Sequence, residues 1–155
     1  MGLVRLPSYR GCFGCGRDNP FGLKLEIFWN EKERCTVCDL KLDERYQGFE
    51  GVIHGGIVST VCDELLWWCI TASLKKCTVT AEMTVKYKRP VKSNERYRAT
   101  ARVVSAKGRR IEAVCRIEEE GGATAAEARG VFIALPQEAW EDFLRGIEDA
   151  DFFKD

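Results

Sequence analysis

The sequence predicts an α+β domain in which a curved antiparallel sheet wraps around one long buried helix. Between residues 57 and 72, apolar side chains cover nearly the whole circumference of a helix, which is typical of a helix buried on all sides. After Cys77 the apolar period changes to two and recurs in successive segments, which predicts strands with one buried face. The length of 155 residues fits one domain, 1–155, with a core at about 11–135 and a C-terminal helix at about 136–149.

The first part of the chain predicts a loop followed by a hairpin. Residues 8–22 are rich in glycine and other turn-forming residues. In residues 23–28, leucines and an isoleucine alternate with other side chains, which predicts a first strand. Residues 34–42 (RCTVCDLKL) predict a second strand that pairs with the first, and residues 43–53 form the loop before the helix.

Asp63 and Glu64 interrupt the apolar helix near its middle. A carboxylate in a buried helix costs several kcal/mol unless it is paired or used. The two acids therefore argue against a membrane span and require a role that packing alone does not supply. The helix is expected to end at residues 73–76, where lysines suit the C-terminal end of the helix dipole.

Four strands and a second helix are expected after the buried helix. The strands are expected at residues 79–87, 97–103, 111–117 and 126–134, and Gly108 and Gly121-Gly122 predict tight turns between them. In the first of these strands, we expect one face to carry Val79, Ala81, Met83, Val85 and Tyr87. An amphipathic helix begins near Pro136 and is followed by an acidic and aromatic tail of six residues, which we expect to be mobile.

Composition narrows the function classes. Lys+Arg and Asp+Glu both number 24, so the chain has no overall basic field and nucleic acid is disfavoured as its partner. Residues 1–6 lack the apolar core of a secretory signal. We therefore expect the eight cysteines to be reduced and the protein to be cytoplasmic, with no membrane partner.

Several short motifs together are similar to one known family. His54-Gly55-Gly56 is followed on the same predicted helix by Asp63, and three further pieces are CFGCGRDNPFGLKL near the start, YKRPV and GRRIE. In this order and spacing, from about residue 11 to 135, the chain resembles the hotdog-fold acyl-CoA thioesterase superfamily, specifically the small phenylacetic-acid-degradation type. The resemblance implies hydrolysis of an acyl-CoA, no cofactor, and a homodimer or homotetramer.

The resemblance also implies roles at the start and middle of the helix. The Gly55 amide would polarise the thioester carbonyl as an oxyanion-hole donor, and Gly56 would allow close approach of the substrate. Asp63 would be the nucleophile or the general base, between which the sequence does not decide. The alternatives are glycines required for helix packing and a structural, ion-paired acid.

Three other polar residues are weaker candidates. Glu64 lies about 100° around the helix from Asp63, and we expect it to face a basic strand residue or a dimer surface. His54, the one histidine, either shapes the start of the helix or acts in acid–base catalysis. Gln47 lies in the loop before it and either orients water or the carbonyl, or is a surface turn residue.

Local clusters of basic residues suit the phosphate groups of coenzyme A. The alternative is an ordinary charged strand edge, which discourages edge-to-edge association. The candidates are Lys86, Lys88, Arg89, Lys107, Arg109 and Arg110.

The cysteines offer a competing hypothesis. Cys12 and Cys15, together with Cys35 and Cys38, match the spacing of a four-cysteine zinc site. The second pair lies in a predicted strand, where positions three apart face opposite sides, so we expect no metal. We interpret the other four as packing residues: Cys62, Cys69, Cys77 and Cys115.

The sequence thus favours an acyl-CoA thioesterase over a non-catalytic acyl-CoA binding module and over a zinc-dependent structural domain. Trp67 and Trp68 either line an acyl pocket or belong to the core. Gly55 and Asp63 are eight residues apart, about 12 Å along a helix, so one helix cannot place both on one thioester. We therefore expect an active site shared by two subunits related by a two-fold axis.

Overall fold

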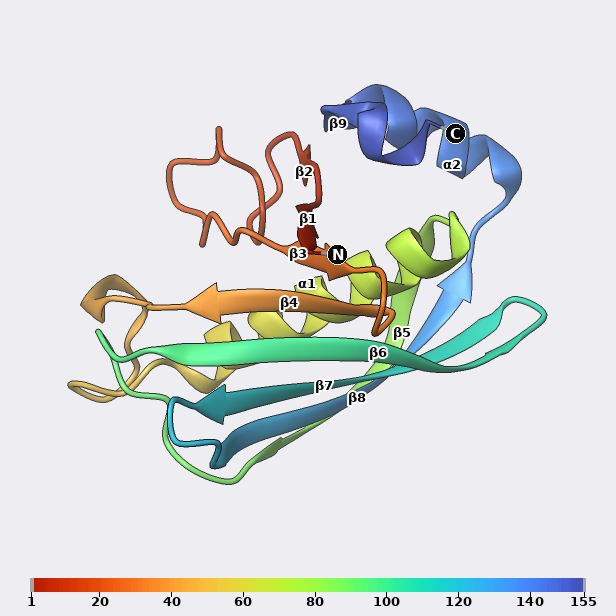
Figure 1. The fold of residues 1–155 in the computed structure, drawn as a ribbon. Coiled ribbons are helices and arrows are strands. Elements are labelled where there is room, and N and C mark those ends of the chain that lie inside the picture. Colours follow the sequence, from red (N-terminus) through yellow and green to blue (C-terminus); the bar gives the residue numbers. More distant parts are fainter. Residues whose placement is uncertain (1, 155) are drawn as a thin grey trace.

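The computed structural model describes residues 2–154, and its main feature is a seven-stranded antiparallel sheet curved around a long helix, α1 (Figure 1). The predicted fold class is therefore confirmed. The strand order across the sheet is β1-β3-β4-β6-β7-β8-β5. The strands in that order are Leu3–Arg5, Phe28–Asn30, Cys35–Leu40, Tyr97–Lys107, Arg110–Glu119, Thr124–Ala134 and Thr78–Tyr87.

Helix α1 spans Gly55–Leu74 and packs against strands β4 to β8. Its buried side chains cover most of the helix circumference, whereas the side with Asp63 and Trp67 is only partly buried. Lys75 ends the helix in a left-handed conformation. By length and apolar composition α1 would also pass for a membrane span, a test that the core helix of a soluble protein passes equally. Small residues on the sheet, including the fully buried Ala99, Ala101 and Ala113, allow the helix to lie close to the strands.

The meander after α1 has the predicted turns. Gly108 and Gly122 adopt positive φ in the β6–β7 and β7–β8 turns, where a residue with a Cβ would be strained. The edge strand β5 departs from the expected alternation, because a bulge shifts its register between Thr80 and Glu82. Val79 remains 48% exposed and Tyr87 54% exposed, so the face predicted for burial is largely open in this chain.

The predicted first strand is placed wrongly. Leu23, Leu25 and Ile27 are buried, but the ladder begins only at β3, which forms the expected hairpin with β4. The backbone of residues 23–25 instead donates hydrogen bonds to the carbonyls of Phe13 and Gly14. Alternating burial therefore arises from packing onto the preceding loop rather than from the sheet.

The C-terminal helix α2, Gln137–Gly146, packs over the C-terminal end of α1 (Figure 1). Phe143 contacts both Trp67 and Trp68 of α1, which places these tryptophans in an aromatic core. Strand β9, Ile147–Glu148, then pairs with β2, Ser8–Tyr9. The expectation of a mobile tail is wrong over the described residues, because the 3-10 turn Ala150–Phe153 packs Phe153 edge-on against Trp140. One further 3-10 turn, Glu44–Tyr46, precedes α1.

Candidate functional site

Asp63 lies on the side of α1 that faces β5. Its carboxylate accepts a hydrogen bond of 2.7 Å from the Thr80 hydroxyl, and its side chain is only partly buried. Thr80 stands beside the β5 bulge, which sets the direction of its side chain. The sequence gives no signal for Thr80, because it is one of several threonines in a strand and only the packing of β5 along α1 brings it to Asp63. The pair fixes one carboxylate in a position that is partly open to solvent.

The start of α1 presents a backbone donor. His54 is the N-cap, and its Nδ1 accepts a hydrogen bond of 2.9 Å from the Gly56 N–H. A Cβ on Gly56 would lie 3.1 Å from that nitrogen, so glycine permits this cap. The hydrogen bonds of residues 2–154 leave the Gly55 N–H without an acceptor. An unoccupied N–H at a helix N-terminus is suited to a negatively charged oxygen.

Tyr87 is a second contact that the sequence did not reveal. From the end of β5, its hydroxyl donates to the Gly55 carbonyl at 3.0 Å and also contacts the Ser59 hydroxyl. β5 is therefore fastened to α1 at both ends of the candidate site, through Thr80 and through Tyr87. Gly55 and Asp63 remain about 12 Å apart along the helix, so they do not meet within one chain.

The loop before α1 is held by its own hydrogen bonds. Gln47 accepts a hydrogen bond from the Gly51 N–H at 3.1 Å, and its backbone bridges to Ile53. The His54 N–H donates to the Tyr46 carbonyl at 2.9 Å. Both Gln47 and His54 thus hold the loop that leads to the helix N-terminus.

Among the described residues, Glu64 faces a thiol and an indole rather than a basic strand residue, which corrects that half of the prediction. Its carboxylate accepts hydrogen bonds from the Trp68 indole at 3.1 Å and from the Cys12 thiol at 3.4 Å. It lies against the loop between β2 and β3, where a Cβ on Gly14 would stand 2.5 Å from it. Burial, and then the neighbouring Cys12, raise the pKa of Glu64 to about 8.

The four-cysteine arrangement is not assembled. Cys12 and Cys15 converge with Glu64 on one side, and within residues 2–154 no other group of three potential ligands converges. Cys38 instead donates its thiol hydrogen bond to the Asp39 carbonyl. Cys62, Cys69 and Cys115 are buried in the core, as predicted, and Cys77 is partly buried.

The six basic candidates fall into two groups at opposite ends of the sheet. Lys86 pairs in register with Glu127 of β8, whereas Arg110 pairs with Ile133. Six residues of strand separate those partners, or about 20 Å. The remaining members follow this division: Lys88 and Arg89 lie near Lys86, and Lys107 and Arg109 lie near Arg110. One chain therefore does not gather them into a single phosphate site.

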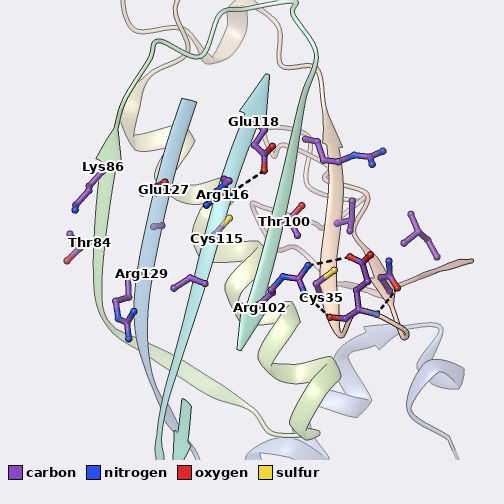
Figure 2. A pocket seen from close by; sticks show the side chains of 17 residues that line it. Cys35, Thr84, Lys86, Thr100, Arg102, Cys115, Arg116, Glu118, Glu127 and Arg129 are labelled. Carbon is purple, nitrogen blue, oxygen red and sulfur yellow. Dashed lines mark hydrogen bonds and ion pairs between the residues drawn. The ribbon is translucent and has the colours of Figure 1, made fainter. Parts of the chain in front are cut away.

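A broad groove of about 1040 Å³ crosses the sheet on the face away from α1 (Figure 2). Figure 2 shows Arg102, Arg116 and Arg129 on this face, in front of the helix. Each of the three forms an ion pair with a glutamate, and the groove does not include Asp63. The groove is a charged outer surface of the sheet, separate from the candidate site.

The chain is similar in sequence to known acyl-coenzyme A thioesterases. It is 29% identical over 127 residues to acyl-coenzyme A thioesterase THEM4 of Bos taurus, and the aligned segment covers 81% of this chain and 52% of that protein. It is 26% identical to THEM4 of Rattus norvegicus, over 76% of this chain and 51% of that protein. The chain thus spans about half the length of the curated relatives it matches.

Solved structures of low identity share the fold. A thioesterase superfamily protein aligns with a TM-score of 0.74 at 24% identity, covering 80% of this chain and 60% of its own. A phenylacetic acid degradation-related protein of Ralstonia eutropha aligns with a TM-score of 0.64 at 18% identity, covering 72% of this chain and 85% of its own. A hypothetical thioesterase protein of Streptococcus pneumoniae, solved with coenzyme A, aligns with a TM-score of 0.62 at 19% identity, covering 66% of this chain and 80% of its own.

The family model for the thioesterase superfamily matches residues 50–126, which include α1, β5, β6, β7 and the start of β8. This segment carries the His54 cap, the free Gly55 N–H and the Asp63–Thr80 pair. The fold around it is that of the solved thioesterases. In sequence, residues 50–126 are thus similar to the thioesterase superfamily, and the chain has the hotdog fold of the solved thioesterases.

Proposed function

We propose that the protein is an acyl-CoA thioesterase, which hydrolyses an acyl-CoA to a free acid and coenzyme A. The observation that carries the proposal is the Asp63 carboxylate held by Thr80 on a helix whose N-terminal Gly55 N–H is free. The match to the thioesterase superfamily model supports the reaction class, and the names of the THEM4 relatives support acyl-CoA as the substrate. The coenzyme A bound to the Streptococcus pneumoniae protein supports the same substrate class.

The chemistry adds water across the thioester. In one route Asp63 removes a proton from water, which attacks the acyl carbon; in the other Asp63 attacks first and water then cleaves the acyl-enzyme. In both, the carbon–sulfur bond breaks and the sulfur leaves as the thiol of coenzyme A. Thr80 holds the carboxylate for either attack. The Streptococcus pneumoniae protein has also been solved as alanine variants of an aspartate and of a threonine sixteen positions later, and Thr80 follows Asp63 by seventeen.

We infer that two subunits share each active site. Productive contacts need about 3 Å, and the helix separates Gly55 from Asp63 by about 12 Å. An antiparallel second copy of α1 would place the Gly55 N–H of one subunit near Asp63 of the other. The exposed apolar Val79 and Tyr87 on β5 lie beside these residues and would be covered by that copy. The proposed assembly is a homodimer or a dimer of dimers.

The direct test is thiol release from a panel of acyl-CoAs, with Asp63→Ala as the matched variant. Hydrolysis by the wild type that is lost in the variant supports the proposal. Calorimetric binding of coenzyme A without hydrolysis would favour the alternative, a non-catalytic acyl-CoA binding module. The cytoplasmic location stays a prediction, to be checked by fractionation.

The shared site has its own test by subunit mixing. Gly55→Pro removes the N–H at a position that suits proline, because Gly55 is the first helical residue, His54 has φ −56 and ψ 133, and a Cβ there would meet Tyr87 at an ordinary 3.5 Å. Gly55→Ala keeps the N–H and is the control. Mixing inactive Gly55→Pro and Asp63→Ala under conditions of subunit exchange should restore activity, because a heterodimer contains one intact site. Proven exchange without recovery would refute sharing.

A further inference from the structure

The loop between β2 and β3 brings two thiols to the carboxylate of Glu64, on the side of α1 away from Thr80. One ligand atom from each of Cys12, Cys15 and Glu64 lies within 4.8 Å of the other two. Cys15 is buried and Cys12 is partly exposed. This cluster takes no part in the proposed hydrolysis.

We propose that Cys12, Cys15 and Glu64 bind a thiophilic divalent cation, with Zn²⁺ the best fit, which fastens this loop to α1. The distances suit such an ion. Zinc–sulfur bonds of about 2.3 Å and zinc–oxygen bonds of about 2.1 Å at tetrahedral angles place sulfur and oxygen about 3.6 Å apart. The Cys12 Sγ already lies 3.4 Å and 3.6 Å from the two Glu64 oxygens.

The backbone of the loop supports a metal site. The Gly16 N–H donates to the Cys12 carbonyl at 2.9 Å, which closes a tight turn around the two cysteines. A Cβ on Gly16 would lie 2.6 Å from Cys12 backbone atoms, so this turn needs glycine. The Tyr9 N–H donates to the Cys15 Sγ at 3.4 Å, and an N–H donor to sulfur stabilises a thiolate.

The charges at the cluster also call for a cation. The polar partners of Glu64 within residues 2–154 are thiols and the Trp68 indole, with no lysine or arginine ion pair among them. If all three groups ionise as ligands, two thiolates and one carboxylate carry three negative charges, which a divalent ion offsets in large part. The Trp68 N–H, at 3.1 Å from one carboxylate oxygen, would orient the ligand. The fourth tetrahedral position would be taken by water.

The experiment titrates the full chain, reduced with a phosphine and stripped by a chelator, with Co²⁺ as the probe. We expect one Co²⁺ per chain, with sulfur-to-cobalt charge-transfer absorption and visible bands of a tetrahedral ion, and displacement by Zn²⁺. Cys12→Ser should weaken binding about 100-fold, and Glu64→Gln about tenfold while the charge-transfer band remains. Cys77→Ser, a partly exposed cysteine away from the cluster, should bind like the wild type.

Three results would overturn the proposal. Absence of the charge-transfer band in the reduced wild type excludes thiolate ligands, whatever the variants do. Equal binding by wild type and a Cys12→Ser variant whose circular dichroism shows a native fold places the ion elsewhere. The third is a Cys12–Cys15 disulfide that persists under the phosphine with no bound ion, because the two sulfurs would then be joined to each other and not to a metal.

Discussion

Asp63 and Glu64 are neighbours in the sequence, but the two sides of α1 on which they lie have different chemistry. Asp63 faces the edge strand, is partly open to solvent and accepts one hydrogen bond from Thr80. Glu64 faces a loop, and its carboxyl contacts a thiol, an indole and the backbone at Gly14. A rotation of about 100° separates an acid available for chemistry from one that joins two segments of the fold.

The largest difference between the two acids should appear in turnover. Asp63→Asn is expected to lower kcat/KM for acyl-CoA by about 100-fold or more, because an amide of the same size is neither a base nor a nucleophile. Glu64→Gln should lower it by less than about tenfold. Steady-state thiol release at a temperature well below unfolding measures both. Equal losses in the two variants would show that the acids act together.

On the Glu64 side of α1, the larger effect should be on the stability of the fold rather than on turnover. Gly14→Ala is expected to destabilise the fold by about 2 kcal/mol, since its Cβ would stand 2.5 Å from the Glu64 carboxyl in a packed contact. Gly121→Ala is the matched control, because a Cβ there meets nothing within 4 Å. Chemical denaturation measures both variants. A Gly14→Ala protein as stable as the control would mean that the loop yields freely to Glu64.

The sequence predicted the elements of this site better than their surroundings. The buried helix at residues 57–72 and the turns of the meander follow from local patterns, and both are confirmed. The N-cap role of His54 is a finding of the structure. The environment of Glu64 could not be predicted, because it depends on a loop about 50 residues earlier. The strand predicted at residues 23–28 is placed wrongly for a related reason. Alternation of Leu23, Leu25 and Ile27 identifies which side chains are buried, but not which segment the backbone hydrogen-bonds to.

Thr80 illustrates a contact that only tertiary structure supplies. Thr80→Val keeps the shape but removes the donor to Asp63, so kcat is expected to fall about tenfold with a small change in KM. Thr80→Ser keeps the hydroxyl and should retain most of the activity. Full activity of Thr80→Val would show that the carboxylate needs no such partner.

The smallest expected effect concerns the basic residues, which the structure divides between two ends of the sheet. Arg89 lies just after the C-terminal end of β5, two residues beyond Tyr87 and near the start of α1; we call this the β5 end of the sheet. It forms an ion pair with Glu119 at 3.0 Å. If it contacts a phosphate of coenzyme A, Arg89→Ala should raise KM about threefold, leave kcat nearly unchanged, and reduce the dependence of KM on salt. Arg98→Ala, which removes a similar exposed ion pair with Asp39, is the control.

Arg109→Ala tests the other end in the same assay. A rise in KM for Arg89→Ala alone would place the phosphates at the β5 end, whereas equal rises for Arg89→Ala and Arg109→Ala would require a partner subunit to bring the two ends together. A loss in kcat alone, or a KM shift no larger than that of Arg98→Ala, would argue against phosphate contact by Arg89.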